Sequence, residues 1–499
     1  MVSIIFPILF VIIILLIYIY LKRGYSPLPD DLPGVKPQIF FGNLINSGIL
    51  TGKTTFTQVI LDYQRRFGDK FQFWFGSYRC LVFCQMEHAQ TIFADRHTFE
   101  QSPLFLPNFD LLCPNGIAML TGAKWKRHIR VLLPMLKRAK IVGHLERIVE
   151  CADRFIDQNL HSGQVHRDLI PCCQSFTMNV IGFIGFDYDF DIHVNSPIKK
   201  AFQDFIFHAV WLMITPWIPR WLGKIYLICN WKYQRAYRLI HELAEKLAEE
   251  EQNKKNENER PKNLIASLVS SLNEQANDEQ TSSGLTRAEI FDEVLMMILA
   301  GYETTSTALS WFIFFVSKNS RVQQQMKDEL RKHHLLVTDD LTSAPPLTPD
   351  NLASLTYCEC VTKEVLRLAP VAAFTTRIAT RDTIVDDVTV HRDQTVFIPL
   401  HNINTDARYW HHADPRQFIP ERFLAEDQNH HPLAMIPFGG GHRACIGQEL
   451  AWLELKTIIV RMMQRGITFE DTPENTGGYD ERITCFPKNV AVRVRFDRF

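Results

Sequence analysis

Apolar residues recur every three to four positions along most of the chain, which is the spacing of amphipathic helices. This periodicity predicts helices over residues 56–67, 141–160, 232–250, 286–318, 322–333, 351–369 and 446–465. Alternation of apolar and polar residues, typical of strands, is clearest at Lys70–Phe75 and, among turn residues, over 383–399. Two polar stretches, 252–263 and 338–350, indicate exposed loops within helical sequence. The pattern predicts one large, mainly α-helical domain with a minor β portion over residues 46–499.

The helix predicted over 286–318 is apolar on nearly all of its sides. It opens with a Thr-x-x-Glu capping box at Thr286. A helix that is hydrophobic all round lies in the middle of a large domain. Its polar interruption at 303–305 therefore costs free energy unless it serves a purpose. The alternative is a patch that is satisfied within the helix, with the Thr304 hydroxyl bonded to a carbonyl one turn back.

Residues 1–21 contain no charged side chain and are numerous enough to span a bilayer as a helix. Lys22 and Arg23 follow directly, so the positive-inside rule predicts that the rest of the chain lies on the cytosolic side. A cleaved signal peptide would have a basic start, a shorter apolar core and small residues at a cleavage site, and these features are missing. We therefore expect a retained, single-pass transmembrane signal-anchor, with the endoplasmic reticulum membrane as its default location.

The stretch that follows, residues 22–45, is rich in proline. Four prolines occur within eleven residues, together with one glycine: Pro27, Pro29, Pro33, Pro37 and Gly34. Proline fixes φ and cannot continue a helix, so this stretch is expected to be a stiff, extended hinge between the membrane and the domain.

The composition limits the class of protein. Of the 499 residues, 46% are hydrophobic and 22% are charged, which describes a globular chain with a large core. The net charge of −1 argues against binding nucleic acid through bulk positive charge. The 11 cysteines are too scattered for a disulfide scaffold and lack zinc-knuckle spacing, so most are expected to be free thiols in a reducing compartment.

One cysteine stands in an unusual setting near the C-terminus, in the sequence FGGGHRACIG at residues 438–447. The three glycines let the backbone approach a bulky flat group and adopt turns that are closed to other residues. Backbone N–H groups and the N-terminal end of the helix after Gly447 can hold Cys445 as a thiolate. Arg443 offers a fork of donors for a carboxylate. The alternative is a buried structural cysteine beside a glycine-rich turn.

This segment resembles the haem-binding loop of the cytochromes P450, F-x-x-G-x-R-x-C-x-G, at every fixed position. The resemblance implies a P450 fold and haem b (iron protoporphyrin IX) whose iron is ligated by Cys445. The residues that would surround the haem on this loop are Phe438, Gly439, Gly441, Arg443 and Gly447.

Three further motifs of the family follow in the expected order. Residues 300–305, AGYETT, match A/G-G-x-D/E-T-T, in which small residues at 300 and 301 leave room for oxygen, and Glu303 and Thr304 relay protons to it. The E-x-x-R and P-E-R-F motifs imply a buried, structural triad of Glu364, Arg367 and Arg422. Arg377 falls where related proteins place a haem propionate ligand.

One position departs from the family pattern. Trp125 matches the tryptophan of W-x-x-x-R and would contact the haem, but Ile129 stands in place of the arginine. Either His128 or Arg130 takes over the propionate contact, or the contact is absent.

Two surfaces and one pocket can be assigned to partners. Basic residues cluster around the Trp125 helix, where the family docks a flavoprotein reductase; the alternative is a solvated helix. The cluster comprises Lys124, Lys126, Arg127, Arg130, Lys137, Arg138 and Lys140. Residues 201–225 are unusually aromatic and either dip into the bilayer near a substrate entrance or pack in the core. By family position, the substrate pocket contains Phe105, Phe109, Ala300, Val371 and Phe374.

The resemblance implies a monooxygenase that inserts one oxygen atom from dioxygen into a lipophilic small molecule, a xenobiotic, a steroid or a fatty-acid-like compound. Electrons would come from NADPH through cytochrome P450 reductase, with cytochrome b5 as a second candidate donor. One alternative is a haem-thiolate isomerase or dehydratase that rearranges a lipid peroxide without a reductase. Another is a non-catalytic haem sensor. The pair Glu303 and Thr304 favours the monooxygenase over both.

Overall fold

The structure is a computed structural model of the chain. It describes residues 11–12, 14–15, 17–19, 32–103, 109–190, 197–215, 218–253, 263–272, 284–337 and 344–497, with the side chains of 109, 213 and 214 excepted.

Helices make up most of the described chain. They are α2 (Phe56–Phe67), α3 (Met86–Ala94), α4 (Gly122–Leu132), α5 (Arg138–Ile141), α6 (Leu145–Asn159), α7 (Ile170–Phe186), α8 (Pro197–Ile214), α9 (Arg220–Cys229), α10 (Trp231–Asn253), α11 (Leu264–Ser271), α12 (Arg287–Ser317), α13 (Ser320–Lys332), α14 (Pro349–Ser354), α15 (Thr356–Leu368), α16 (Leu400–Asn404) and α17 (Gln448–Gln464). Each predicted helix is confirmed, although 141–160 begins with short turns and 351–369 divides into α14 and α15.

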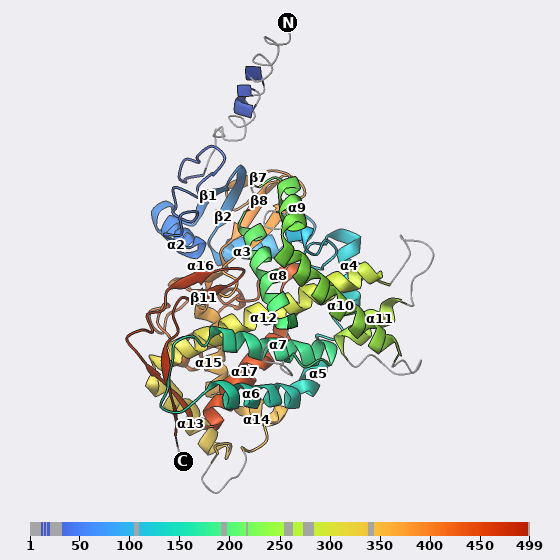
Figure 1. Ribbon diagram of the computed structural model, residues 1–499. Helices are drawn as coiled ribbons and strands as arrows, with labels where there is room; N and C mark the ends of the chain where they lie inside the picture. Colours follow the sequence, from blue (N-terminus) through green and yellow to red (C-terminus); the bar gives the residue numbers. More distant parts are fainter. Residues whose placement is uncertain are drawn as a thin grey trace.

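The strands form a minor portion on one side of the molecule (Figure 1). The largest sheet has the order β1-β2-β8-β5-β3, with only the β2–β8 pair parallel. Its strands are β1 (Lys70–Phe75), β2 (Tyr78–Phe83), β3 (Phe99–Gln101), β5 (Thr375–Ala379) and β8 (Thr395–Ile398). The smaller sheets are built from β4 (Val165–His166), β6 (Thr383–Val385), β7 (Val388–Val390), β9 (Ile467–Asp471), β10 (Tyr479–Glu481), β11 (Cys485–Pro487) and β12 (Val492–Phe496). The fold is therefore mainly helical with a minor sheet, as predicted.

Helix α12 runs through the middle of the helical part, with α7 and α17 packed against it (Figure 1). Its capping box forms as expected, because the Thr286 side chain accepts from the Glu289 N–H and the Glu289 side chain accepts from the Thr286 N–H. At Gly301 a Cβ atom would lie 3.0 Å from Ile181 of α7. This glycine lets the two helices approach closely, which is a different use from the space for oxygen that the sequence suggested.

The N-terminal part is described in two pieces. The described residues between 11 and 19 are helical and exposed. Within the described chain, no helix combines the length and the hydropathy needed to cross a membrane. In the second half of the predicted hinge, Pro33 O accepts a hydrogen bond from Gln72 N of β1 (2.9 Å), and the Asn43 carboxamide bonds both Val35 O and Trp74 N. These hydrogen bonds dock residues 32–45 on the edge of the sheet.

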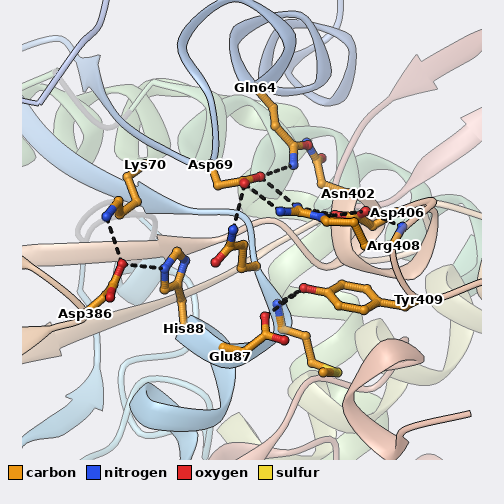
Figure 2. A network of polar contacts seen from close by, with 12 residues as sticks. Gln64, Asp69, Lys70, Glu87, His88, Asp386, Asn402, Asp406, Arg408 and Tyr409 are labelled. Atoms are coloured by element: carbon orange, nitrogen blue, oxygen red, sulfur yellow. Dashed lines mark hydrogen bonds and ion pairs between the residues drawn. The ribbon is translucent and has the colours of Figure 1, made fainter.

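A polar network ties the sheet to the chain that follows α16 (Figure 2). Arg408 forms two parallel bonds with the Asp69 carboxylate, at 2.7 and 2.8 Å. Gln64 and Gln85 donate to the same carboxylate at 2.8 Å each. Burial raises the pKa of Asp69, but these donors outweigh it and lower the pKa to about 2. Asn402 of α16 donates to Gln64, so the network joins α2, the sheet and α16 into one rigid support.

Candidate active site

The cysteine loop is shaped by glycines, as its sequence predicted. Gly439 and Gly441 have φ values of 71° and 70°, in the left-handed region that side chains disfavour. A Cβ atom on Gly441 would lie 2.6 Å from the backbone oxygen of Phe93 in α3, and one on Gly440 would overlap the Phe93 ring. The loop closes with the Cys445 N–H donating to the Phe438 carbonyl (3.0 Å). Close approach of α3 therefore requires glycine here.

The Cys445 thiol is open to solvent, although the helix α17 that follows is buried over most of its length. At the same time, the surrounding protein raises the pKa of the thiol above its ordinary value, and a hydrogen bond from the Gly447 N–H acts in the opposite direction. A thiolate in this place needs a cation beside it, which a bound iron would supply.

Two arginines lie against this loop, and one of them is paired with a carboxylate. Arg443 donates to Glu100 (Nε 2.9 Å, Nη2 2.6 Å) and to the Leu120 carbonyl (2.9 Å). Arg377, which is 2% exposed, donates to the Gly440 carbonyl (3.2 Å), to the Thr376 carbonyl and to Thr375 Oγ1, but to no carboxylate among the described residues. Burial and the neighbouring Arg443 charge lower the pKa of Arg377 to about 10. The cluster therefore carries one more positive than negative charge.

Trp125 of α4 completes this side of the site. The Arg443 guanidinium lies 4.3 Å from the centre of the Trp125 ring, within the range of a cation–π contact. Of the neighbouring basic candidates, His128 is buried with its Nδ1 2.6 Å from Glu293 of α12, and Arg130 is exposed. Ile129 packs against the hydrophobic core. His128 is thus engaged by α12, and a propionate contact from Arg130 stays a prediction.

Helix α12 is buried over most of its length but has a short solvent-accessible face. Ala300 is exposed and Thr304, one turn later, is half-buried, whereas the helix from Ile290 to Leu299 is buried. The Thr304 hydroxyl donates to the Ala300 carbonyl (2.8 Å), so the alternative of an internally satisfied patch is geometrically realised. The open face still lets a small molecule reach this hydroxyl.

Glu303 lies next to that face and is 1% exposed. Burial raises its pKa to about 7, against the smaller lowering influence of Arg482, Gln174 and Thr484. The Gln174 amide donates to its carboxylate at 3.4 Å, and the Thr484 hydroxyl donates at 3.5 Å. A carboxyl that titrates near neutral pH can both take up and release a proton.

Glu364, Arg367 and Arg422 form the buried triad that the motifs implied. Arg367 of α15 makes a bidentate pair with Glu364 (2.7 and 2.8 Å), and Arg422 donates to the same carboxylate (3.0 Å). Arg422 also pairs with Asp427 (3.3 Å). Two guanidinium groups are thus matched by two carboxylates. Arg367 further donates to the Asn404 carbonyl, and the Asn404 side chain accepts from the Ile436 N–H (2.8 Å), just before the cysteine loop.

A cavity of about 630 Å³ lies between the N-terminal turns, α2 and the hairpin β10–β11. Val371 and Phe374, which the sequence assigns to the substrate pocket, line it. Of the described residues, Ala300 is not among those that line this cavity, although it borders the open face of α12. Phe105 and the side chain of Phe109 lie outside the described residues.

A sequence profile of the cytochrome P450 family matches residues 32–475. The chain belongs to the cytochrome P450 family. It is 25% identical to cytochrome P450 3A13 of Mus musculus over 472 residues, which cover 90% of this chain and 88% of that protein. It is 26% identical to cytochrome P450 4V2 of Homo sapiens over 462 residues, covering 87% and 84%. A self-sufficient cytochrome P450 monooxygenase of Oidiodendron maius is 25% identical over 95% of this chain and 43% of its own length.

The protein is therefore an oxidoreductase of a monooxygenase family that binds haem through a cysteine thiolate. The site fits this group in this P450. Cys445 is exposed on a loop whose glycines leave it free of side chains on that stretch, and Arg377 brings a positive charge that is hydrogen-bonded to no carboxylate among the described residues. A haem propionate is the kind of anion that such an arginine would hold.

Sequence reasoning missed three contributors to this P450 site. Glu100 and the Leu120 carbonyl hold Arg443, and the Gly440 carbonyl receives Arg377. Glu100 lies 343 residues before Arg443 in the chain, so no local motif could pair them. Gly440 stands at a variable position of the haem-loop pattern, and only its contact with Phe93 shows why it is small.

Proposed function

We propose that this P450 is a haem-thiolate monooxygenase that oxidises a neutral, lipophilic small molecule with electrons from NADPH, delivered by a flavoprotein reductase. The observation that carries the proposal is Glu303, a buried carboxyl whose pKa of about 7 suits proton transfer. It lies beside Thr304, whose hydroxyl is accessible on α12. A haem-thiolate isomerase would need no such proton source.

Separate residues of the chain would hold the haem and transfer the proton. The haem, when bound, supplies the oxygen chemistry, which a thiolate ligand favours by pushing electron density to the iron. Cys445 would hold it from one side, and Arg377, Arg443 and Trp125 would hold its edge. Glu303 takes a proton from its hydrogen-bonded surroundings and passes it towards Thr304. The apolar surroundings of α12 keep bulk water from that transfer.

The substrate class follows from the lining of the 630 Å³ cavity. Its walls are mainly apolar and aromatic, with Phe56, Phe75, Val371 and Phe374 among them. The charged residues at its rim are largely matched, because Arg482 pairs with Asp480 (2.8 Å) and the Glu481 carboxylate accepts from the N-terminus of α2. The cavity thus favours an uncharged molecule of drug or steroid size.

The basic cluster near Trp125 is proposed as the docking surface for NADPH-cytochrome P450 reductase, with cytochrome b5 as a second candidate. Lys124, Lys126, Arg130, Lys137, Arg138 and Lys140 are all exposed, and none forms an ion pair within the described chain. Only Arg127 is engaged inward, with Glu289 and the Gly284 carbonyl. Such a free positive patch steers an acidic partner.

Association with the endoplasmic reticulum membrane is proposed from two apolar surfaces, in addition to the apolar residues 1–21. Ile39, Phe40 and Leu50 are exposed in the N-terminal turns, and α9 exposes its own apolar face. Figure 1 places both at the same end of the molecule. Of the aromatic residues predicted to meet the bilayer, Phe207 and Trp221 are exposed, Phe205 is buried, and Trp217 lies outside the described residues.

The test combines the full-length haem protein with reductase, NADPH and lipophilic candidate substrates. We expect substrate-dependent NADPH consumption and a product that carries one oxygen atom from ¹⁸O-labelled dioxygen. Turnover of a lipid hydroperoxide without reductase, NADPH or dioxygen would assign the protein to the isomerase class. A Glu303→Gln variant should slow product formation and divert NADPH to reduced oxygen species.

A further inference from the structure

The stretch from the start of α8 to the first part of α10, residues 197–239, is basic in a chain whose net charge is −1. Residues 197–239 include a single acidic residue, Asp204. The basic residues of the same stretch are Lys199, Lys200, Arg220, Lys224, Lys232, Arg235 and Arg238. A local excess of this size points to an anionic partner.

Helix α9 in the middle of this region carries an exposed apolar face. Trp221, Ile225 and Ile228 are 62%, 49% and 61% exposed, and their spacing of four and three positions places them on one side of the helix. Trp231, the first residue of α10, is 67% exposed. Exposed tryptophans beside aliphatic residues are typical of the level of lipid headgroups.

A cavity of about 100 Å³ lies between α8 and α10, next to this face. Lys200 and Asp204 line it from α8, and Lys232 and Arg235 line it from α10, beside the Trp231 ring. Lys232 and Arg235 stand three positions apart and therefore share one side of α10. Within the described ranges, Lys200, Lys232 and Arg235 form no ion pair. The cavity thus has two positive charges more than negative ones, and it holds the volume of about three waters at ~30 Å³ each.

We propose that this cavity binds the phosphate-bearing headgroup of an anionic phospholipid. The lysines and Arg235 would contact phosphate oxygens, with the guanidinium as a bidentate donor. Trp231 would lie at the headgroup level while the apolar face of α9 contacts the acyl chains. Seated in this way, the headgroup fixes the tilt of α8–α10 against the bilayer. The assignment rests on the membrane association proposed above and is independent of the haem chemistry.

The experiment uses the full chain with its haem, reconstituted in vesicles of phosphatidylcholine alone or with phosphatidylserine added. Amide hydrogen exchange is measured over 197–239, with α13 as an internal reference. We expect slower exchange over 197–239 only in the vesicles that contain phosphatidylserine. The variant Lys200→Gln/Lys232→Gln/Arg235→Gln should lose this difference, whereas Lys200→Arg/Lys232→Arg/Arg235→Lys should keep it.

A matched control removes three exposed positive charges outside α8–α10 and α13, in Arg65→Gln/Arg392→Gln/Arg493→Gln, and should keep the wild-type difference. Equal exchange in both vesicles, or equal loss in the control, overturns the proposal. Inorganic phosphate added to phosphatidylcholine vesicles tests the other source of the same chemistry. If it reproduces the protection, the ligand is a free phosphate and the lipid assignment is wrong. The haem spectrum of each sample separates failure here from failure of the proposed function.

Discussion

The P450 contains two arginine clusters that differ in charge balance. In one, Arg367 and Arg422 are matched by Glu364 and Asp427, all at most 2% exposed. In the other, Arg377 and Arg443 lie near the single carboxylate of Glu100, which accepts hydrogen bonds from Arg443 and not from Arg377. The first cluster is complete without any ligand. The second leaves one positive charge that the described residues do not pair.

This difference separates a structural role from a binding role. Buried charges are costly, and the cost is offset only when each one is paired and hydrogen-bonded. A fully paired cluster stabilises the fold, so removal of any one of its charges should lower the free energy of unfolding. A cluster with surplus charge is tolerated because a bound anion completes it, so its removal should affect haem binding more than folding. The four predictions below test this contrast.

The largest effect is expected at the balanced cluster. Glu364→Gln leaves Arg367 and Arg422 with one carboxylate between them, and it should lower the free energy of unfolding by about 3–5 kcal/mol. Denaturant titration of the full-length protein measures this loss. Glu150→Gln, which breaks the exposed pair with Arg147, is the control and should change stability by less than about 1 kcal/mol. Similar losses in both variants would remove the basis of the comparison.

Glu303 extends the comparison to a buried carboxyl without a guanidinium bonded to it. Its pKa of about 7 in the folded state lies above the ordinary 4.5, so the folded state holds the proton more strongly. The resulting stability is fully present below pH 4.5 and is lost as the pH rises through 7. Relative to Glu303→Gln, the wild type should lose about 3 kcal/mol across this window. Denaturant titrations at several pH values measure it, and parallel pH profiles would show that the carboxyl is not shifted.

In the cluster of Arg377, Arg443 and Glu100, loss of an arginine should weaken haem binding more than it lowers stability. Arg377→Gln removes the guanidinium that has no carboxylate partner, so stability without haem should fall by less than half of the loss in Glu364→Gln. Haem affinity should drop roughly 10–100-fold, the effect of one charged hydrogen-bonding group. Haem titration of the apoprotein measures it, with the exposed Arg331→Gln as control. A large loss of apoprotein stability with unchanged haem affinity would reverse the two roles.

The smallest effect is expected from restoring the family arginine. Ile129→Arg adds a further positive charge near the unbalanced cluster, so we expect haem to transfer to apomyoglobin a few-fold more slowly. The apoprotein should be destabilised by about 1 kcal/mol because the new charge is uncompensated without haem. Ile129→Met, which adds length without charge, is the matched control. Faster haem loss in the arginine variant alone would show that this helix turns away from the haem edge.

Local patterns predicted most of the fold and the centre of the site. The helix 56–67 and the strand Lys70–Phe75 have the predicted bounds, because their periodicity and their turns lie within a few residues. Cys445 is predictable because its loop matches a short local motif, the P450 haem-binding loop, whose glycines are needed for geometric reasons. Glu100 could not be found, since its role arises from a contact with Arg443 across more than three hundred residues. Likewise, the contact of His128 with Glu293 and the close approach of α7 at Gly301 depend on how helices pack, which local patterns do not reveal.

The central claim is that Cys445 ligates the haem iron as a thiolate. The most direct test is the difference spectrum of dithionite-reduced membranes with and without carbon monoxide, beside a Cys445→Ala control. A strongly red-shifted Soret band that the control lacks would establish the thiolate ligand at Cys445. A band at the position of histidine-ligated haem, unchanged in the control, would mean that another residue holds the iron and would contradict the assignment of this site.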